Sequence, residues 1–160
     1  MNLIAPTQVE SGLRKPLQIP DGARIQIVCD NDFDTKQLKE KFLKEGLTSE
    51  CAKTVSEGCD AARSGRYQVV VSTPVLGDGS WRRLIEIAKY YDLGFETILW
   101  ASNFDLSEWA NALNEGAFDV LDAVREGPKV VEATKRALWA AYLKGAGPRP
   151  RANLPPRNAA

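Results

Sequence analysis

The chain has 160 residues, of which 44% are hydrophobic and 26% charged, and this length and composition suit one soluble domain with a single core. Its 21 lysines and arginines balance its 21 aspartates and glutamates, so no nucleic-acid footprint is expected. The chain has no histidine, and its three cysteines, Cys29, Cys51 and Cys59, form no close C-x-x-C pair, which excludes the usual zinc ligand sets. The odd cysteine count favours reduced thiols in a cytoplasm.

The two ends of the chain differ in composition from the rest. Residues 1–22 contain prolines without an apolar period, and residues 146–160 mix proline, glycine and arginine. Neither segment can bury an apolar face, so we expect a flexible N-terminal arm, one domain over residues 23–145 and a flexible tail. The start of the chain has the pattern of neither a signal peptide nor a membrane anchor, and no apolar run approaches the length of a membrane span.

Apolar runs alternate with amphipathic ones between the two ends, and this alternation predicts five strands and five helices. In chain order the predicted elements are strand 23–29, helix 34–46, strand 48–54, helix 56–65, strand 67–73, helix 80–94, strand 95–102, helix 105–116, strand 117–122 and helix 128–145.

Local signals predict where several of these helices begin or end. Asp34 with Gln37, and Asp105 with Glu108, have the spacing of capping boxes. Gly94 is the predicted stop of the third helix, since glycine adopts the left-handed conformation at helix ends without penalty.

Apolar residues at helical spacing predict the buried face of three helices. The expected buried positions are Leu84, Ile87, Ala88 and Tyr91 in the third helix, Leu106, Ala110 and Leu113 in the fourth, and Val130, Val131, Thr134, Leu138 and Ala141 in the last.

The alternation of strands and helices predicts a doubly wound α/β fold, because parallel crossovers place helices on both faces of the sheet. In such folds ligands bind beyond the carboxyl ends of the strands, near the point where the strand order reverses. The segments to consider are therefore "CDND" (29–32), "STPVLGDG" (72–79), "ASNFD" (101–105) and "DAVRE" (122–126).

From Arg24 to Leu143 the chain resembles the receiver domain of two-component response regulators. The spacing of the first and third strands, the "LGDG" loop at residues 76–79, the "NEGAFDVL" passage at 114–121 and the amphipathic last helix all match that family. The resemblance implies a flavodoxin-like, CheY-like sheet of five parallel strands in the order 2-1-3-4-5. It also implies a phosphoryl-accepting aspartate at the end of the third strand.

The residues at the active positions depart from the receiver pattern. A working receiver holds a divalent cation with two acidic residues after the first strand, and these positions are Cys29 and Asp30 here. The phosphoacceptor aligns with Thr73, the hydroxyl at the end of the fourth strand with Ala101, and the lysine after the fifth strand with Ala123.

Two further positions differ as well. The aromatic residue that reports the switch aligns with Val120, and the proline after the lysine aligns with Val124. The last of these departures removes the basis for expecting the usual peptide geometry there.

These substitutions predict a site without phosphoryl chemistry. Magnesium prefers hard oxygen ligands, so Asp30 alone is at most a weak ligand, and we expect neither a bound magnesium ion nor another cofactor. The Thr73 hydroxyl would need an activating base, and the chain has no histidine to supply one. We therefore expect no enzymatic activity.

Each of these residues also has a structural interpretation, which we favour. Ser72 and Thr73 fit strand-end hydroxyls, Cys29 a packed thiol and Asp30 a cap for the following loop. Asp122, beside the position of the missing lysine, fits an exposed strand-end acid, with repulsion of anions as the alternative.

The sequence therefore favours a stand-alone degenerate receiver, or pseudo-receiver, that acts in bacterial signal transduction through protein contacts independent of phosphorylation. A helical wheel of the last helix turns Trp139 and Leu143 away from the core, beside Glu132 and Arg136, as a candidate interaction surface. The alternative for Trp139 is that the Pro/Arg-rich tail covers it.

The expected partner is a protein of the same pathway, such as a histidine kinase or another regulator, with a homodimer as a further candidate. Nucleic acid and membranes are not expected as partners. Two alternatives for the function stay open: a phosphorelay response regulator with an atypical acceptor, and a flavodoxin-like domain that binds a small ligand in the crevice.

Overall fold

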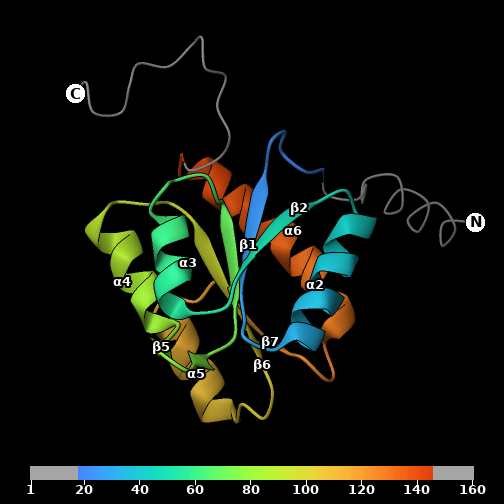
Figure 1. The fold of residues 1–160 in the computed structure, drawn as a ribbon, viewed down its shortest axis with the longest axis vertical. Coiled ribbons are helices and arrows are strands. Elements are labelled where there is room, and N and C mark those ends of the chain that lie inside the picture. Colours follow the sequence, from blue (N-terminus) through green and yellow to red (C-terminus); the bar gives the residue numbers. More distant parts are fainter. Residues whose placement is uncertain (1–17, 146–160) are drawn as a thin grey trace, which may run out of the picture.

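The computed structural model describes residues 18–145, and five parallel strands form its main sheet in the order β2-β1-β3-β6-β7 (Figure 1). Counted along this sheet alone, the order is 2-1-3-4-5, so the flavodoxin-like, doubly wound α/β fold is confirmed. The strands are β1 (Arg24–Val28), β2 (Thr48–Ala52), β3 (Val69–Ser72), β6 (Glu96–Ala101) and β7 (Asp119–Asp122).

A short antiparallel hairpin outside the main sheet was not predicted. It consists of β4 (Val75–Leu76) and β5 (Gly79–Ser80), which flank the turn of the "LGDG" loop.

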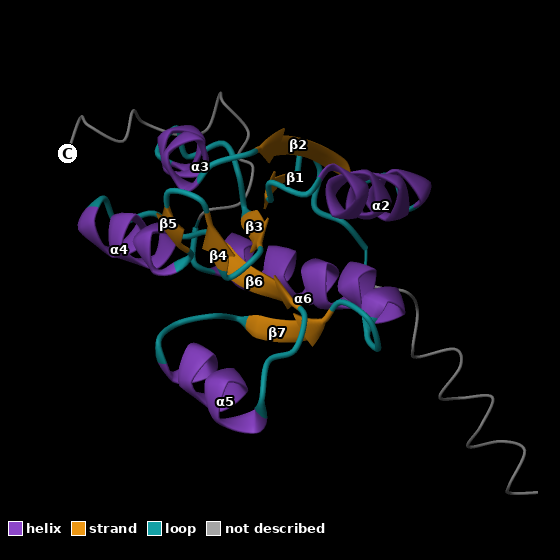
Figure 2. Ribbon diagram, turned by 60° about the horizontal axis from the view of Figure 1, so that its bottom comes forward, coloured by secondary structure: helices purple, strands orange, loops and turns teal. Residues whose placement is uncertain are grey.

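Helices cover both faces of the main sheet, with α2 and α6 on one side and α3, α4 and α5 on the other (Figure 2). They are α2 (Asp32–Lys44), α3 (Val55–Ala62), α4 (Arg82–Tyr90), α5 (Leu106–Asn114) and α6 (Val130–Leu143), with the 3-10 turn η1 (Gly127–Lys129) before α6. Within residues 18–145, no helix has both the length and the apolar character needed to span a membrane.

The central strand β3 is buried on both faces, which explains its continuous apolar sequence. Val69 and Val71 pack in the core beneath α2 and α6, whereas Val70 packs beneath α3 and α4. A strand buried in this way needs apolar residues at every position, so the fold places the most apolar run of the chain at the centre of the sheet.

The predicted start of α2 is wrong. Asn31, not Asp34, is the N-cap, and its side-chain oxygen accepts a hydrogen bond from the Asp34 amide at 2.9 Å. The helix begins directly after the strand because Asn31 supplies a cap earlier in the chain. Asp32 and Asp34 then lie in the first turn, where negative charge is favourable.

The predicted end of α4 is also wrong. The residue in the left-handed conformation is Asp92, with φ of 54°, and not Gly94. The Leu93 amide closes this end by donating to the Ala88 carbonyl at 2.8 Å. Tyr91, predicted to be buried, follows the last helical residue and is exposed, whereas Leu84 is fully buried as predicted.

The buried face of α5 differs from the predicted one. The capping box of Asp105 and Glu108 is confirmed, but Leu106 is exposed and Ala112 is the buried residue of the helix. Ala110 is likewise exposed. The helix packs beside β7 at the edge of the sheet, where only a narrow stripe of it can be covered.

The last helix follows the predicted pattern closely. Val130, Thr134, Leu138 and Ala141 are buried, and Val131 is partly buried against the same core.

Candidate functional site at the carboxyl edge of the sheet

The ends of β1 and β3 lie side by side at the point where the strand order reverses. Val28 pairs with Ser72, and the Thr73 amide donates to the Val28 carbonyl at 3.1 Å. Cys29 and Thr73, the residues that follow the paired positions, therefore lie next to each other, as the alignment of the active positions requires.

The two hydroxyls at the end of β3 have different surroundings. Ser72 is fully buried, and its hydroxyl donates to the Thr73 carbonyl at 2.7 Å, so it acts as a local strand-end group. The Thr73 side chain is half-buried, and its hydroxyl oxygen has no hydrogen-bond partner among residues 18–145. No group that accepts a proton from this hydroxyl is therefore in place there.

The residues after β1 do not form a ligand cluster. Cys29 is buried and its thiol donates weakly to the Asn31 carbonyl, with 3.6 Å between sulfur and oxygen. Asp30 is exposed. Over the described part of the chain, no three side chains of histidine, cysteine, aspartate or glutamate gather in a way that could hold a metal ion.

The ends of β6 and β7 lack charged groups that point into the crevice from the aligned positions. Ala101 is buried and Ala123 half-buried, and the Ala123 amide donates to the Ala101 carbonyl at 2.8 Å. Asp122 accepts hydrogen bonds from the amides of Val124 at 2.9 Å and Arg125 at 3.1 Å. Its carboxylate therefore shapes the loop after β7 and adds negative charge beside the crevice.

Solved structures of receiver domains match this chain over most of its length. The receiver domain of a response regulator from Clostridium thermocellum is 21% identical, with a TM-score of 0.67 and coverage of 76% of this chain and 98% of that chain. The chain has the fold of a response-regulator receiver domain. No family model matches the sequence, and neither does any curated protein.

Two further structures agree with this receiver fold. The receiver domain of an HD-domain-containing protein from Pseudomonas fluorescens Pf-5 is 20% identical, with a TM-score of 0.66 and coverage of 76% and 98% of the two chains. The non-phosphorylated HemR receiver domain from Leptospira biflexa is 22% identical, with a TM-score of 0.64 and coverage of 72% and 94%.

One residue that holds this receiver fold together was not singled out from the sequence. Asp78, in the turn between β4 and β5, accepts hydrogen bonds from the amides of Val55 at 2.8 Å and Ser56 at 2.9 Å, at the start of α3. The amides of Ser56 and Val55 hold the pKa of the Asp78 carboxyl below its ordinary value. The two segments are more than twenty residues apart, so local patterns carry no signal for this contact.

Trp139 is not among the core residues, yet it is less exposed than the predicted interaction surface requires. Its side chain is half-buried, its indole N–H donates to the Gln18 carbonyl, and its ring meets Tyr142 edge to face at 5.4 Å between centroids. The physical reason is that the residues before β1 lie against α6, with Ile19 packed on the core and Pro20 buried. Coverage by the Pro/Arg-rich tail concerns residues outside the described part of the chain.

The other three residues of the predicted surface are exposed. Leu143 has an exposed fraction of 80%, and Glu132 and Arg136 are exposed on the same helix. Arg136 reaches Asp119 of β7 at 3.6 Å, so this side of α6 faces β7 and α5. The structure thus separates Trp139, which is held by Gln18, from the side of α6 that bears Arg136.

A groove of about 600 Å³ lies between α5, β7 and α6. Its apolar side is formed by Leu106 and Trp109, with exposed fractions of 78% and 40%, and the Trp109 indole donates to the Val120 carbonyl at 3.2 Å. Glu132 and Arg136 also line it. Leu106 was predicted to be buried and Trp109 was not singled out, so the sequence did not indicate this groove.

Proposed function

We propose that this chain is a degenerate receiver that acts in bacterial signal transduction through protein contacts, without being phosphorylated. The observation that carries the proposal is Thr73 at the carboxyl end of β3, beside the buried thiol of Cys29 and at an edge of the sheet where β6 ends in Ala101 and Ala123 follows β7. The receiver fold brings these residues to the positions of a receiver's active site, and their side chains lack the groups that phosphoryl transfer needs.

The chemistry of these positions supports the proposal. An aspartate nucleophile is already ionised at neutral pH, whereas a threonine hydroxyl must lose a proton to a base. Phosphoryl transfer also needs a cation or donors that stabilise the charge on the moving group. Asp30 and Asp122 add negative charge to this edge instead, which opposes the approach of a phosphate. We accordingly propose that the chain binds no magnesium ion of functional importance and catalyses no reaction.

The groove between α5, β7 and α6 is the surface we assign to the partner. Large exposed apolar side chains are enriched at contact sites, and aromatic anchors contribute most of the binding energy there. Leu106 and Trp109 provide such groups, and Glu132 and Arg136 provide charges of both signs at the margin. A protein of the same pathway, such as a histidine kinase or another regulator, fits this mixed surface.

The test of the proposal is treatment of the full chain with acetyl phosphate and magnesium, followed by intact-mass measurement. The mass of the wild-type chain is expected to stay unchanged after the treatment. The mass of Thr73→Asp is also expected to stay unchanged, because Cys29, Ala101 and Ala123 supply neither a cation ligand nor a group that stabilises the transferring phosphoryl charge, and such groups act as a unit. An acyl-phosphate adduct on any aspartate of the wild-type chain would establish the alternative, a phosphorelay regulator with an atypical acceptor. Rapid labelling of Thr73→Asp alone would show that the other substitutions are not disabling.

A further inference from the structure

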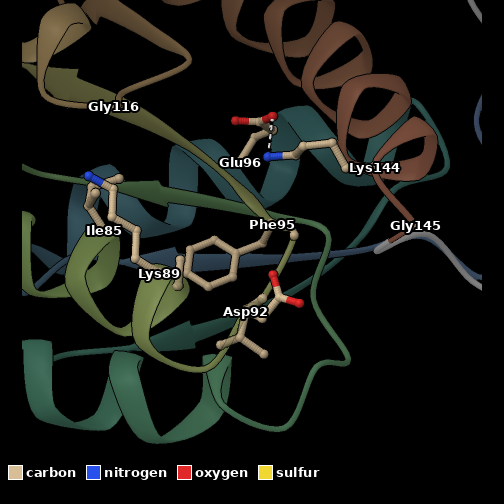
Figure 3. A pocket seen from close by; sticks show the side chains of 11 residues that line it. Ile85, Lys89, Asp92, Phe95, Glu96, Gly116, Lys144 and Gly145 are labelled. Carbon is tan, nitrogen blue, oxygen red and sulfur yellow. Dashed lines mark ion pairs between the residues drawn. The ribbon is translucent and has the colours of Figure 1, made fainter. Parts of the chain in front are cut away.

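A pocket of about 560 Å³ opens at the end of the sheet opposite the crevice, where β6 begins and α6 ends (Figure 3). Its volume lies in the range of pockets that hold small ligands or peptide segments. The residues that line it come from α4, the turn after it, the start of β6, the turn between α5 and β7, and the two residues that follow α6. It shares no residue with the groove between α5, β7 and α6.

The charged groups of this pocket are arranged around an apolar centre. The Phe95 ring lies in the middle, with the Lys89 ammonium on one side of it and the Asp92 carboxylate on the other (Figure 3). Glu96 and Lys144 form an ion pair of 2.7 Å and so neutralise each other. Over residues 18–145, neither Asp92 nor Lys89 has an ion-pair partner, so the Asp92 side of the Phe95 ring presents an unpaired carboxylate and the Lys89 side an unpaired ammonium.

The chain leaves the described domain at this same pocket. Gly145 is both a lining residue and the last described residue, and its φ of 91° turns the chain at the end of α6. Residues 146–160 follow this lining residue directly in the sequence. They contain three arginines, four prolines and Leu154, and they contain no acidic side chain.

The length of this segment fits a return into the pocket. Three residues lie between Gly145 and Arg149, and an extended chain covers at most about 3.3–3.6 Å per residue, so the Arg149 guanidinium is tethered close to the rim. Prolines restrict the free segment and lower the entropy lost when it is ordered. A segment tethered this closely has an effective concentration in the millimolar range, so even a weak contact is populated.

We propose that residues 148–154 of the tail dock into this pocket within the same chain, with the prolines and Leu154 against Phe95 and the Arg149 guanidinium beside Asp92. The occupant is favoured by the point at which the chain enters, by its basic and acid-free composition, and by the unpaired carboxylate of Asp92. This contact is independent of the proposed function, because it uses neither the crevice nor the groove.

Limited trypsin digestion of the full chain tests the docking. The Arg149–Pro150 bond resists trypsin, so the informative bond is Arg151–Ala152, followed as the mass of the product that ends at Arg151. Asp92→Lys is expected to increase the rate of this cleavage severalfold by releasing the tail. The double variant Asp92→Lys with Arg149→Asp is expected to restore slow cleavage, because the pair is then reversed in sign.

Asp60→Lys is the matched control, since Asp60 is an exposed acid on α3 that does not line the pocket. In this variant, trypsin is expected to cleave the Arg151–Ala152 bond at the wild-type rate. Equal cleavage rates in wild type, Asp92→Lys and the double variant would overturn the proposal. Protection that increases with protein concentration would also overturn it, since the occupant would then be the tail of a second copy.

Discussion

Asp78 shows how a single side chain outside a helix stabilises the beginning of that helix. Thr54 is the N-cap of α3 and accepts from the Glu57 amide, yet the amides of Val55 and Ser56 bind Asp78. The N-terminus of a helix has free amide donors, and a carboxylate satisfies two of them while also favouring the helix dipole. The hairpin of β4 and β5 is thereby fastened to α3.

We predict that Asp78→Ala lowers the melting temperature at neutral pH and that the difference from wild type shrinks in acid. The folded pKa of Asp78 lies below its unfolded value, so its contribution is present above the unfolded pKa of about 4 and is lost as the pH falls through the folded value. Thermal melts of both chains between neutral pH and about pH 3 measure this difference. A difference that stays constant over this range would show that the ionised carboxylate is not responsible.

At the scale of elements, α3 and β1 approach so closely that a helix position must be glycine. A Cβ added at Gly58 would lie 2.7 Å from Cγ2 of Val28, a fully buried residue. Alanine in a helix gains about 1 kcal/mol over glycine, whereas overpacking a core costs about 1–3 kcal/mol. The steric cost is therefore expected to exceed the gain in helix propensity.

Gly58→Ala is predicted to lower the melting temperature by several degrees, as measured by calorimetry or circular dichroism. Gly77→Ala is the control, because nothing lies within 4 Å of a Cβ at that position, and it is expected to have little effect. In the Val28→Ala background the added methyl has space, so Gly58→Ala should cost less there. Equal costs in the two backgrounds would contradict the steric argument.

The contact between α6 and the residues before β1 also stabilises the domain. Trp139 is half-buried between Gln18 and Tyr142. Truncation of a fully buried tryptophan to alanine costs about 3–5 kcal/mol, so Trp139→Ala is predicted to cost roughly half of that and to lower the melting temperature by several degrees. Leu143→Ala, at an exposed position one turn later, is the control and should change stability by less than about 0.5 kcal/mol.

Sedimentation measures assembly in the same two variants. The assembly state is expected to be unchanged by Trp139→Ala, because the indole faces Gln18 rather than solvent. A loss of assembly without a change in melting temperature would reverse this assignment and return Trp139 to an interaction surface.

The elements themselves were predictable because their signals are local. The capping box of Asp105 and Glu108 forms as its spacing predicts. The equivalent spacing at Asp34 did not form a cap because Asn31 offers a competing side chain three residues earlier. The choice between the two caps depends on where β1 ends, and the end of β1 is set by its pairing with the neighbouring strands rather than by the local sequence.

At the scale of the whole molecule, the doubly wound parallel sheet followed from the alternation of strands and helices, and the strand order from the resemblance to receiver domains, whereas the surfaces followed from neither. The positions of Cys29 and Thr73 were predictable because two parallel strands bring their ends together. The helical wheel predicted a freely exposed Trp139 because it treats α6 as covered by the sheet alone. Contacts with residues far away in sequence, such as Gln18, decide which outward side chains remain exposed.

The proposed partner surface leads to a prediction that a pair of matched leucines can test. Leu106 on α5 and Leu43 on α2 have exposed fractions of 78% and 74%, but only Leu106 lines the groove between α5, β7 and α6. Leu106→Asp places a charge in the apolar part of that groove and is predicted to abolish capture of the partner in a pull-down, since an unpaired charge at a contact must lose its water. Leu43→Asp should capture the partner as wild type does.

Both variants should keep their melting temperature within the range of surface substitutions, because neither leucine is buried. Loss of capture in both variants, or in neither, would mean that the groove is not the partner surface.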